Sequence, residues 1–228
     1  MPLSDALFET RIARHVQLPY LLYTVNQPAP PEGYPLLLFL HGSGERGTDL
    51  SLLRQHSLPR LLADGLDFPG LVLMPQCPPN SIWSLFQEGL IALLNDIQDH
   101  FAVDAARICL MGLSMGGAGA WDLVLHSPDV FAGLVAICPP NRWIFGYPDQ
   151  LIHVRHIPVW QFHGETDSVV AVEDSRELAS VFRALGGEIR LTIYSNTGHN
   201  AWKPAFQEPE LWPWLLNLRR QAPETSQT

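Results

Sequence analysis

Residues 111–121, MGLSMGGAGAW, decide the fold, because they place Ser114 in a Gly112-x-Ser114-x-Gly116 pattern between an apolar run and a helix-forming segment. A sharp turn from strand to helix exposes a serine hydroxyl. Glycines beside it leave no β-carbon to clash where the strand and the helix approach each other. A serine hydroxyl is a weak nucleophile unless a base activates it. The stretch therefore predicts a catalytic turn if the rest of the chain supplies a base, an acid and oxyanion donors.

Two other kinds of glycine-rich turn are excluded by the neighbouring residues. A phosphate-binding loop needs the pattern G-x-x-x-x-G-K-[ST], and no lysine lies near this turn. A dinucleotide-binding turn belongs to a first strand–helix unit and needs an acidic residue on a later strand. We therefore interpret the turn as one that presents a serine to a substrate.

Short apolar runs alternate with helix-forming segments along the chain. The strand-like runs are residues 36–41, 71–75, 108–113, 134–138, 159–163 and 189–194, and the helical segments are residues 50–64, 87–100, 115–126, 175–185 and 212–220. The runs are apolar on both faces, as in strands that helices cover on both sides. This alternation predicts the α/β class, with a mostly parallel sheet between two helical layers. Residues 18–25 alternate less clearly and are compatible with an edge strand.

The length of 228 residues and the apolar content of 46% are enough for one well-packed domain, which we expect to span residues 1–220. No internal repeat is present in the sequence, and the proline-rich residues 27–35 are expected to connect two strands. The polar residues 221–228 are expected to form a flexible tail.

A formal net charge of −9 argues against a nucleic-acid-binding protein, since such proteins are usually basic. No apolar run approaches the ~18 residues that a membrane span needs. Residues 1–15 contain acidic side chains and lack the apolar segment of a secretory signal, which indicates a cytoplasmic protein. Cys77, Cys109 and Cys138 are far apart and are expected to be buried. The histidines show no metal-binding spacing, so neither a metal nor an organic cofactor is expected.

Candidate partners of Ser114 follow two later strand-like runs. Asp167 comes after residues 159–163 and His199 comes after residues 189–194, each in a turn. Ligands of a parallel sheet bind beyond the carboxyl ends of its strands, where these turns lie. The order serine, aspartate, histidine is the one found with a serine turn of this kind. His199 is the expected base, and Asp167 is expected to fix its tautomer and stabilise the imidazolium.

Other titratable residues compete for these roles. Glu165 lies too close to the strand end to replace Asp167, and Asp174 is expected to cap the following helix. His41 and His163 begin His-Gly turns and are expected to brace their loops.

An oxyanion hole needs two backbone amides aimed at the developing charge. One is expected from Met115, which follows the nucleophile, and the other from the loop HGSGERG after the first long strand-like run. Ser43 is the expected donor in that loop, with Gly44 as the alternative. Glu45 and Arg46 are expected to pair at the surface of the loop, where such pairs contribute little stability.

In these segments the chain resembles the α/β-hydrolase superfamily. It is most similar to the small bacterial esterases grouped with phospholipase/carboxylesterases, dienelactone hydrolases, polyhydroxybutyrate-depolymerase-like proteins and "predicted peptidases". The matching segments are LPYLLYTV, PLLLFLHGSGERG, LVLMPQCPPNSIWS, GLSMGGAGAWDL, HGETDSVV and TGHNAW, in order over most of residues 18–203. The resemblance implies the α/β-hydrolase fold and a Ser114-Asp167-His199 triad that hydrolyses carboxylic esters. Dienelactone-type enzymes normally use a cysteine nucleophile, so the serine argues against that activity.

Trp83, Trp143 and Trp202 lie in loops on the side of the sheet expected for the site, so they are candidates for the wall of an apolar substrate pocket. The alternative is that they pack these loops onto the domain. Residues 139–157, where many relatives insert a lid, are too few for a separate helical domain. We therefore expect an open active site.

These patterns predict a serine carboxylesterase that forms an acyl-enzyme on Ser114 and takes a small-molecule ester. A thioesterase acting on acylated proteins or coenzyme A esters is an alternative. A serine peptidase of the same fold is less favoured, because amides need stronger protonation of the leaving group and no second domain gates peptides. A non-catalytic binding protein of this fold typically lacks a triad residue, whereas all three positions are filled here.

Overall fold

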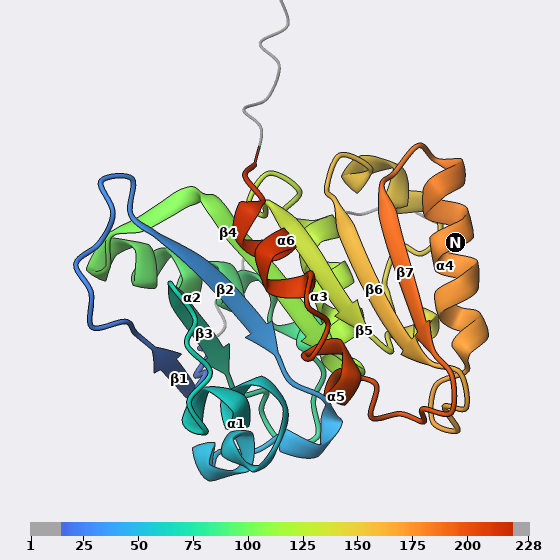
Figure 1. Cartoon of the computed structure of the whole chain (residues 1–228), viewed down its shortest axis with the longest axis horizontal. Coiled ribbons are helices and arrows are strands. Elements are labelled where there is room, and N and C mark those ends of the chain that lie inside the picture. The colour runs from blue at the N-terminus through green and yellow to red at the C-terminus, as the bar shows by residue number, and fades with distance from the viewer. Residues whose placement is uncertain (1–14, 221–228) are drawn as a thin grey trace, which may run out of the picture.

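The computed structural model describes residues 15–220, and one seven-stranded sheet runs through them (Figure 1). The strands are β1 (Tyr20–Tyr23), β2 (Tyr34–Leu40), β3 (Leu71–Pro75), β4 (Val103–Leu113), β5 (Gly133–Ile137), β6 (Val159–Gly164) and β7 (Ile189–Tyr194). Their order in the sheet is β1-β3-β2-β4-β5-β6-β7. β1 pairs antiparallel with β3, and the other pairings are parallel. The mostly parallel sheet expected from the sequence is confirmed. The edge strand β1 lies within residues 18–25, where the sequence pattern alternates less clearly.

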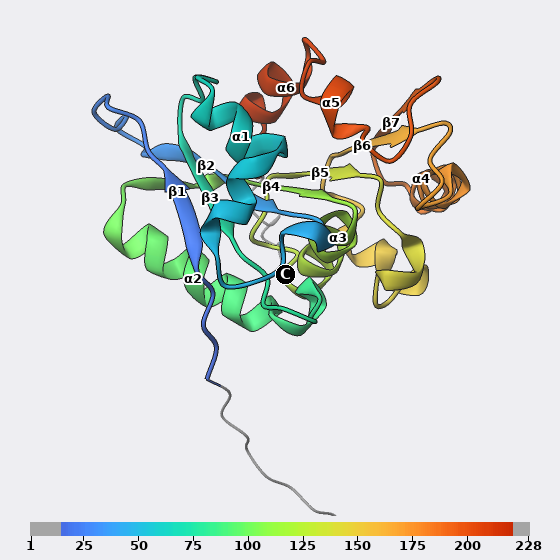
Figure 2. The ribbon, with the colours of Figure 1, turned by 90° about the horizontal axis from the view of Figure 1, so that it is seen from below.

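Helices cover both faces of the sheet, as Figure 2 shows from the end of the molecule toward which the parallel strands point. The helices are α1 (Ser57–Ala63), α2 (Gln87–His100), α3 (Met115–His126), α4 (Val172–Ala184), α5 (Trp202–Ala205) and α6 (Leu211–Asn217). The apolar side chains of α2, α3 and α4 belong to one core cluster, and those of α1, α5 and α6 belong to the other. The sheet therefore separates two cores.

The side chains of β2 show why both faces need cover. Leu36, Leu38 and Leu40 join the core cluster of α2, α3 and α4, whereas Leu37 and Phe39 join the cluster on the other face. All five side chains are buried. Because successive side chains of a strand point to opposite faces, a strand between two cores is apolar at every position.

The helix expected over residues 50–64 is interrupted in the structure. A 3-10 helix, Leu50–Gln55, precedes α1, and His56 separates them with an extended backbone (φ −158°, ψ −172°). Ser57 then has a φ of 57°, in the left-handed region. The last expected helix is also shorter than expected, because α6 ends at Asn217.

Residues 139–157 contain two short 3-10 helices, Asn141–Trp143 and Asp149–Val154, and form no separate helical domain. Among residues 15–220, no helix combines the length and apolar character needed to cross a membrane. The tail expected at residues 221–228 lies outside the described residues. All three cysteines are buried and free, as expected.

Candidate active site

The turn between β4 and α3 holds Ser114 in a strained backbone conformation, with φ 53° and ψ −118°. A β-carbon on Gly112 would lie 2.0 Å from the carbonyl oxygen of Gly116, and one on Gly116 would lie 2.0 Å from the carbonyl oxygen of Leu40. Both positions therefore accept only glycine. The Ser114 amide donates to the Ile137 carbonyl at 2.7 Å, which ties the turn to the end of β5.

The fold brings the three residues expected to form a triad together at the carboxyl ends of the strands. Nδ1 of His199 lies 2.7 Å from Oδ2 of Asp167, and Nε2 of His199 lies 2.9 Å from Oγ of Ser114. An ionised carboxylate can only accept, so Nδ1 carries the ring proton and Nε2 accepts from the serine hydroxyl. Ser114, His199 and Asp167 therefore form one continuous hydrogen-bonded series.

Asp167 is surrounded by donors. Its Oδ1 accepts from the backbone amides of Val169 at 2.8 Å and Val170 at 3.0 Å. Its Oδ2 accepts from His199 and lies 3.3 Å from Nε2 of His163. Burial alone would raise the pKa of this carboxyl, but the hydrogen bonds from Val170, His199 and Val169 outweigh it and hold the pKa below its usual range. Asp167 is therefore ionised at neutral pH.

His163 packs beside Asp167 and helps to hold its carboxylate in place. Its Nε2 lies 3.1 Å from the Val170 carbonyl, which can only accept, so this nitrogen carries the proton. Its Nδ1 lies 2.6 Å from the hydroxyl of Ser175, which donates to it. The ring is fully buried, and burial lowers its pKa. The bracing role expected for His163 thus has a geometric basis in a neutral ring beside Asp167.

The two competing acids have other contacts. Glu165 is exposed and lies 3.6 Å from Arg176. Asp174 lies within the first turn of α4, and its carboxylate accepts from the Asn141 amide at 3.1 Å. Asp174 therefore ties the loop after β5 to α4 rather than capping the helix, whose N-cap is Ala171.

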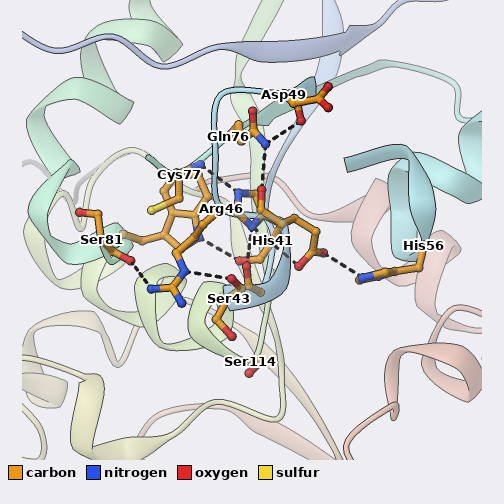
Figure 3. Close-up of polar contacts among 12 residues, drawn as sticks. His41, Ser43, Arg46, Asp49, His56, Gln76, Cys77, Ser81 and Ser114 are labelled. Carbon is orange, nitrogen blue, oxygen red and sulfur yellow. Dashed lines mark hydrogen bonds and ion pairs between the residues drawn. The ribbon is translucent and has the colours of Figure 1, made fainter. Parts of the chain in front are cut away.

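His41 fixes the loop after β2, the expected oxyanion loop (Figure 3). Its Nε2 accepts from the Cys77 amide at 2.9 Å, and its Nδ1 lies 2.6 Å from the Gly42 carbonyl, to which it donates. The Trp83 indole donates to the His41 carbonyl at 2.9 Å. Burial lowers the pKa of His41 to about 4, so the ring is neutral. Ring and carbonyl of one residue thus anchor the start of the loop.

Two side chains hold the rest of the loop, Arg46 from within the loop and Gln76 from the segment after β3, as Figure 3 shows. Nε of Arg46 donates to the Ser43 carbonyl at 2.9 Å, and the same guanidinium donates to the Ser81 carbonyl at 3.1 Å. Nε2 of Gln76 donates to the carbonyls of Glu45 and Asp49 at 2.9 Å each. These contacts fix the backbone that carries the expected oxyanion donors.

The expected oxyanion donors are amides at helix starts. Ser43 is the first residue of the 3-10 helix Ser43–Glu45, and Met115 is the first residue of α3. First-turn amides have no acceptor within their own helix, and no hydrogen bond among the described residues engages these two. Gly42 packs against Leu113, so the two segments are adjacent.

Glu45 differs from its expected place at the surface. It is 4% exposed, and its carboxylate lies 3.5 Å from Nε2 of His56 and 4.0 Å from Nδ1 of His41, not against Arg46. Burial raises the pKa of this carboxyl. An acidic residue in a glycine-rich loop is ordinarily solvated, so nothing local in the sequence signalled its burial.

The three expected pocket tryptophans lie in different environments. Trp83 is 1% exposed and contacts the His41 ring edge-on at 5.0 Å, so it supports the oxyanion loop from within the core instead of lining an open pocket. Trp143 is half-buried against the core. Trp202 is half-buried, and its ring lies edge-on to His199 at 6.3 Å.

Cys138 is a neighbour of the triad that sequence reasoning treated only as a buried apolar residue. Its thiol contacts the His199 carbonyl at 3.7 Å, and burial raises its pKa to about 12, so it stays protonated and donates. The ligand atoms of Cys138, Asp167 and His199 all lie within 4.8 Å of one another. They could hold a cation only by giving up the hydrogen bond between Asp167 and His199.

Comparisons with known proteins place the chain. Residues 84–209 match the family described as phospholipase/carboxylesterase. An acyl-protein thioesterase 1 from Gibberella zeae is 28% identical over 123 residues, which cover 51% of this chain and 49% of that protein. A lysophospholipase-like protein 1 from Mus musculus is 28% identical over 203 residues, covering 77% of this chain and 84% of that protein. The chain thus spans about half the length of the first of these relatives.

Solved structures agree on the fold. A thermostable esterase superposes with a TM-score of 0.76 and 33% identity over 90% of this chain and 60% of that one. A ferulic acid esterase superposes with a TM-score of 0.61 at 19% identity, over 80% of this chain and 84% of that one, and shows the fold alone. The resemblance noted in the sequence is confirmed: the chain has the α/β-hydrolase fold and belongs to the phospholipase/carboxylesterase family.

Proposed function

We propose that the protein is a serine carboxylesterase that hydrolyses small-molecule carboxylic esters through an acyl-enzyme on Ser114. The observation that carries the proposal is the continuous hydrogen-bonded series from Ser114 through His199 to Asp167, at 2.9 and 2.7 Å. A hydroxyl that donates to a neutral imidazole, whose other nitrogen donates to a buried carboxylate, is poised for nucleophilic attack.

In the first half of the reaction, Oγ of Ser114 attacks the ester carbonyl and its proton passes to Nε2 of His199. Asp167 stabilises the resulting imidazolium. The amides of Ser43 and Met115 donate to the oxyanion of the tetrahedral intermediate. The imidazolium then protonates the alcohol oxygen, the carbon–oxygen bond breaks, and the acyl group stays on Ser114.

In the second half, His199 takes a proton from water, and the hydroxide attacks the acyl carbonyl. The tetrahedral intermediate collapses when His199 returns the proton to Oγ of Ser114. The carboxylic acid leaves and the resting state is restored. The depressed pKa of Asp167 supports this cycle, because the acid stays ionised throughout.

The described part of the chain favours soluble esters over aggregated lipid. Residues 139–157 are only two short 3-10 helices and a connecting loop, so they supply no separate domain to close over Ser114. Lids of that kind are used to admit substrates at lipid surfaces, so an open site suits freely diffusing esters.

A thioesterase is the second candidate, and the acyl-protein thioesterase relative favours it. The same residues would perform both reactions, with a thiolate in place of an alkoxide as leaving group. Thiolates need little protonation to leave, so a thioesterase would tolerate loss of the general-acid step better than an esterase.

Hydrolysis of p-nitrophenyl esters from acetate to palmitate, of methyl ferulate, and of matched acyl-coenzyme A thioesters tests both candidates. We expect turnover of esters by the wild type and none by Ser114→Ala. Thioesterase activity alone would assign the second candidate. No turnover of either set by a folded wild type would refute both.

A further inference from the structure

A cavity of about 410 Å³ lies between the α1 and α5 segments, beside the candidate triad. Figure 2 shows α1 and α5 on the same face of the sheet, flanking the end where the parallel strands stop. The wall is formed by His56, Ser57 and Leu61 on one side and by Trp202, Lys203 and Phe206 on the other. We propose that this cavity binds one arm of the ester substrate, an apolar chain or ring that ends in a carboxylate. This inference rests on the proposed function and names its substrate class.

The wall of the cavity neighbours both the base His199 and the oxyanion loop. The ring of Trp202 lies edge-on to His199, with centroids 6.3 Å apart. On the same wall, Trp202 stacks on His56 at 5.7 Å, and Nε2 of His56 lies 3.5 Å from the carboxylate of Glu45 in the oxyanion loop. Trp202 and His56 therefore connect the cavity wall to the base and to the oxyanion loop, and an arm held against them would extend from the candidate site.

The wall is apolar but contains buried polar atoms that lack partners. Leu61, Trp202 and Phe206 supply its apolar surface. Among the described residues, neither Oγ of Ser57 nor Nδ1 of His56 has a hydrogen-bond partner, although both atoms are buried. Ser57 is 6% exposed and holds a φ of 57°. Buried polar atoms are nearly always satisfied, so two orphans beside a strained residue mark this segment as shaped by more than packing. Both atoms are buried, so the arm would contact the apolar side chains of the wall rather than these two atoms.

The positive charge of Lys203 at the rim of the cavity favours a substrate arm that ends in a carboxylate. Lys203 is the only lysine of a chain with net charge −9, and it is exposed at this cavity. Its side chain makes no ion pair or hydrogen bond within residues 15–220. Arg60 also borders the cavity, but Nε of Arg60 is held by Asp64 at 2.6 Å. One free ammonium beside an apolar wall fits a carboxylate at the end of an apolar arm.

The arm could be the acyl group or the alcohol, and paired substrates distinguish the two. For the acyl arm, the p-nitrophenyl monoester of adipic acid is compared with its neutral methyl ester. For the alcohol arm, 4-acetoxyphenylacetate is compared with methyl 4-acetoxyphenylacetate. The wild type should show a higher kcat/KM for the anionic member of one pair, which identifies the arm.

The matched variants are Lys203→Met and Arg54→Gln. Arg54 is an exposed cation on the 3-10 helix before α1, and it does not line the cavity. Lys203→Met should lower kcat/KM for the preferred anionic ester roughly two- to five-fold and leave its neutral partner unchanged. Lys203→Arg should restore the preference, and Arg54→Gln should change neither ester. An anionic-to-neutral ratio that is equal in the wild type and in Lys203→Met for both pairs would overturn the proposal.

Binding separates this proposal from the proposed function. Calorimetry of 6-phenylhexanoate and 6-phenylhexanol with Ser114→Ala needs no turnover. We expect the carboxylate to bind more tightly than the alcohol, and Gln207→Trp, which places a large ring at the cavity rim, to weaken both. Carboxylate binding with no ester hydrolysis by the wild type would refute the esterase activity and support the cavity as a binding site. Ester hydrolysis by the wild type, together with carboxylate binding that neither Lys203→Met nor Gln207→Trp changes, would refute the role of the cavity and leave the esterase proposal standing.

Discussion

Two His-Gly turns, at His41 after β2 and at His163 after β6, make similar sequence patterns but hold their loops in opposite ways. Both rings are buried, and burial lowers the pKa of both. His41 accepts a hydrogen bond at Nε2 from the Cys77 amide. His163 instead presents a protonated Nε2 to the Val170 carbonyl and to Asp167. The same residue pair therefore carries two tautomers.

The difference lies in where the partners come from. Asp167 takes its amide hydrogen bonds from Val169 and Val170, within its own turn. The oxyanion loop depends on Gln76 and on the Ser81 carbonyl, in the segment that follows β3. The acid turn is thus locally determined, whereas the oxyanion loop is held by a neighbouring segment. Changes in the first should act on charge and proton transfer, and changes in the second should act on the position of the amides.

Replacement of Asp167 by asparagine should have the largest effect. The amide cannot stabilise the imidazolium and favours the wrong His199 tautomer, so kcat should fall about 10⁴-fold. Steady-state kinetics with p-nitrophenyl acetate and circular dichroism of the variant measure this. A fall below ten-fold in a folded variant would contradict the assignment of the acid.

Replacement of His41 by phenylalanine should act through the oxyanion loop. The Cys77 amide would lose its acceptor, the loop would shift, and kcat should fall about 10²-fold, as for loss of one oxyanion donor. KM should change little, because the donors act on the transition state. A raised KM with normal kcat would place the effect on substrate binding and contradict this role.

Replacement of His163 by phenylalanine should have a smaller effect, about 10-fold on kcat. Asp167 would keep its two amide donors and His199, and would lose only the donor at 3.3 Å. The pKa of Asp167 should rise in His163→Phe, since one group that favours the ionised acid is gone, and NMR titration of this carboxyl measures the change. Ser175→Ala is the matched control, because it leaves His163 in place. An unchanged Asp167 pKa in His163→Phe would show a purely structural role.

The two histidines also predict how stability depends on pH. The folded pKa of His41 is about 4, below its ordinary 6.5, and that of His163 is lowered too. Below pH 6.5 the unfolded chain binds more protons at these histidines than the folded chain does. Their contribution to the free energy of unfolding is therefore fully present above pH 6.5 and decreases as the pH falls toward 4. One group contributes a slope of at most ~1.4 kcal/mol per pH unit. His163→Gln should reduce the slope between pH 4.5 and 6.5 in urea titrations, and a steeper slope would contradict it.

Glu165→Gln should have the smallest effect. Glu165 is exposed beside Arg176 and makes no contact with His199 among the contacts of the described residues. We expect kcat/KM to stay within about two-fold of wild type, as for a surface ion pair. A loss comparable with that of Asp167→Asn would reassign the acid of the site.

The sequence predicts the elements that local chemistry determines. The glycines around Ser114 and the all-apolar strands follow from sterics and from burial on both faces, so the strand ends and the turns carrying Asp167 and His199 could be placed. The break at His56 was missed, because an extended residue followed by a serine with positive φ is compatible with a helical pattern on either side. The break coincides with contacts of His56 to Glu45 and Trp202, and the spacing of apolar residues along a helix carries no information about such tertiary contacts.

Contacts between distant segments account for the rest. The burial of Glu45 depends on His56 and Gln76, and the place of Trp83 depends on the His41 carbonyl. None of these pairs has a periodic spacing in the chain. A charged residue in a glycine loop and a tryptophan after a strand therefore looked like surface and pocket positions, although the fold buries both.

The central claim is that Ser114 carries the acyl group, and mass spectrometry of the acid-quenched reaction with p-nitrophenyl butyrate, before and after digestion into peptides, tests it most directly. We expect a burst of p-nitrophenol and a butyryl adduct on the peptide that contains Ser114, with neither in Ser114→Ala. Turnover without any adduct, or an adduct on another residue such as Cys138, would contradict the mechanism.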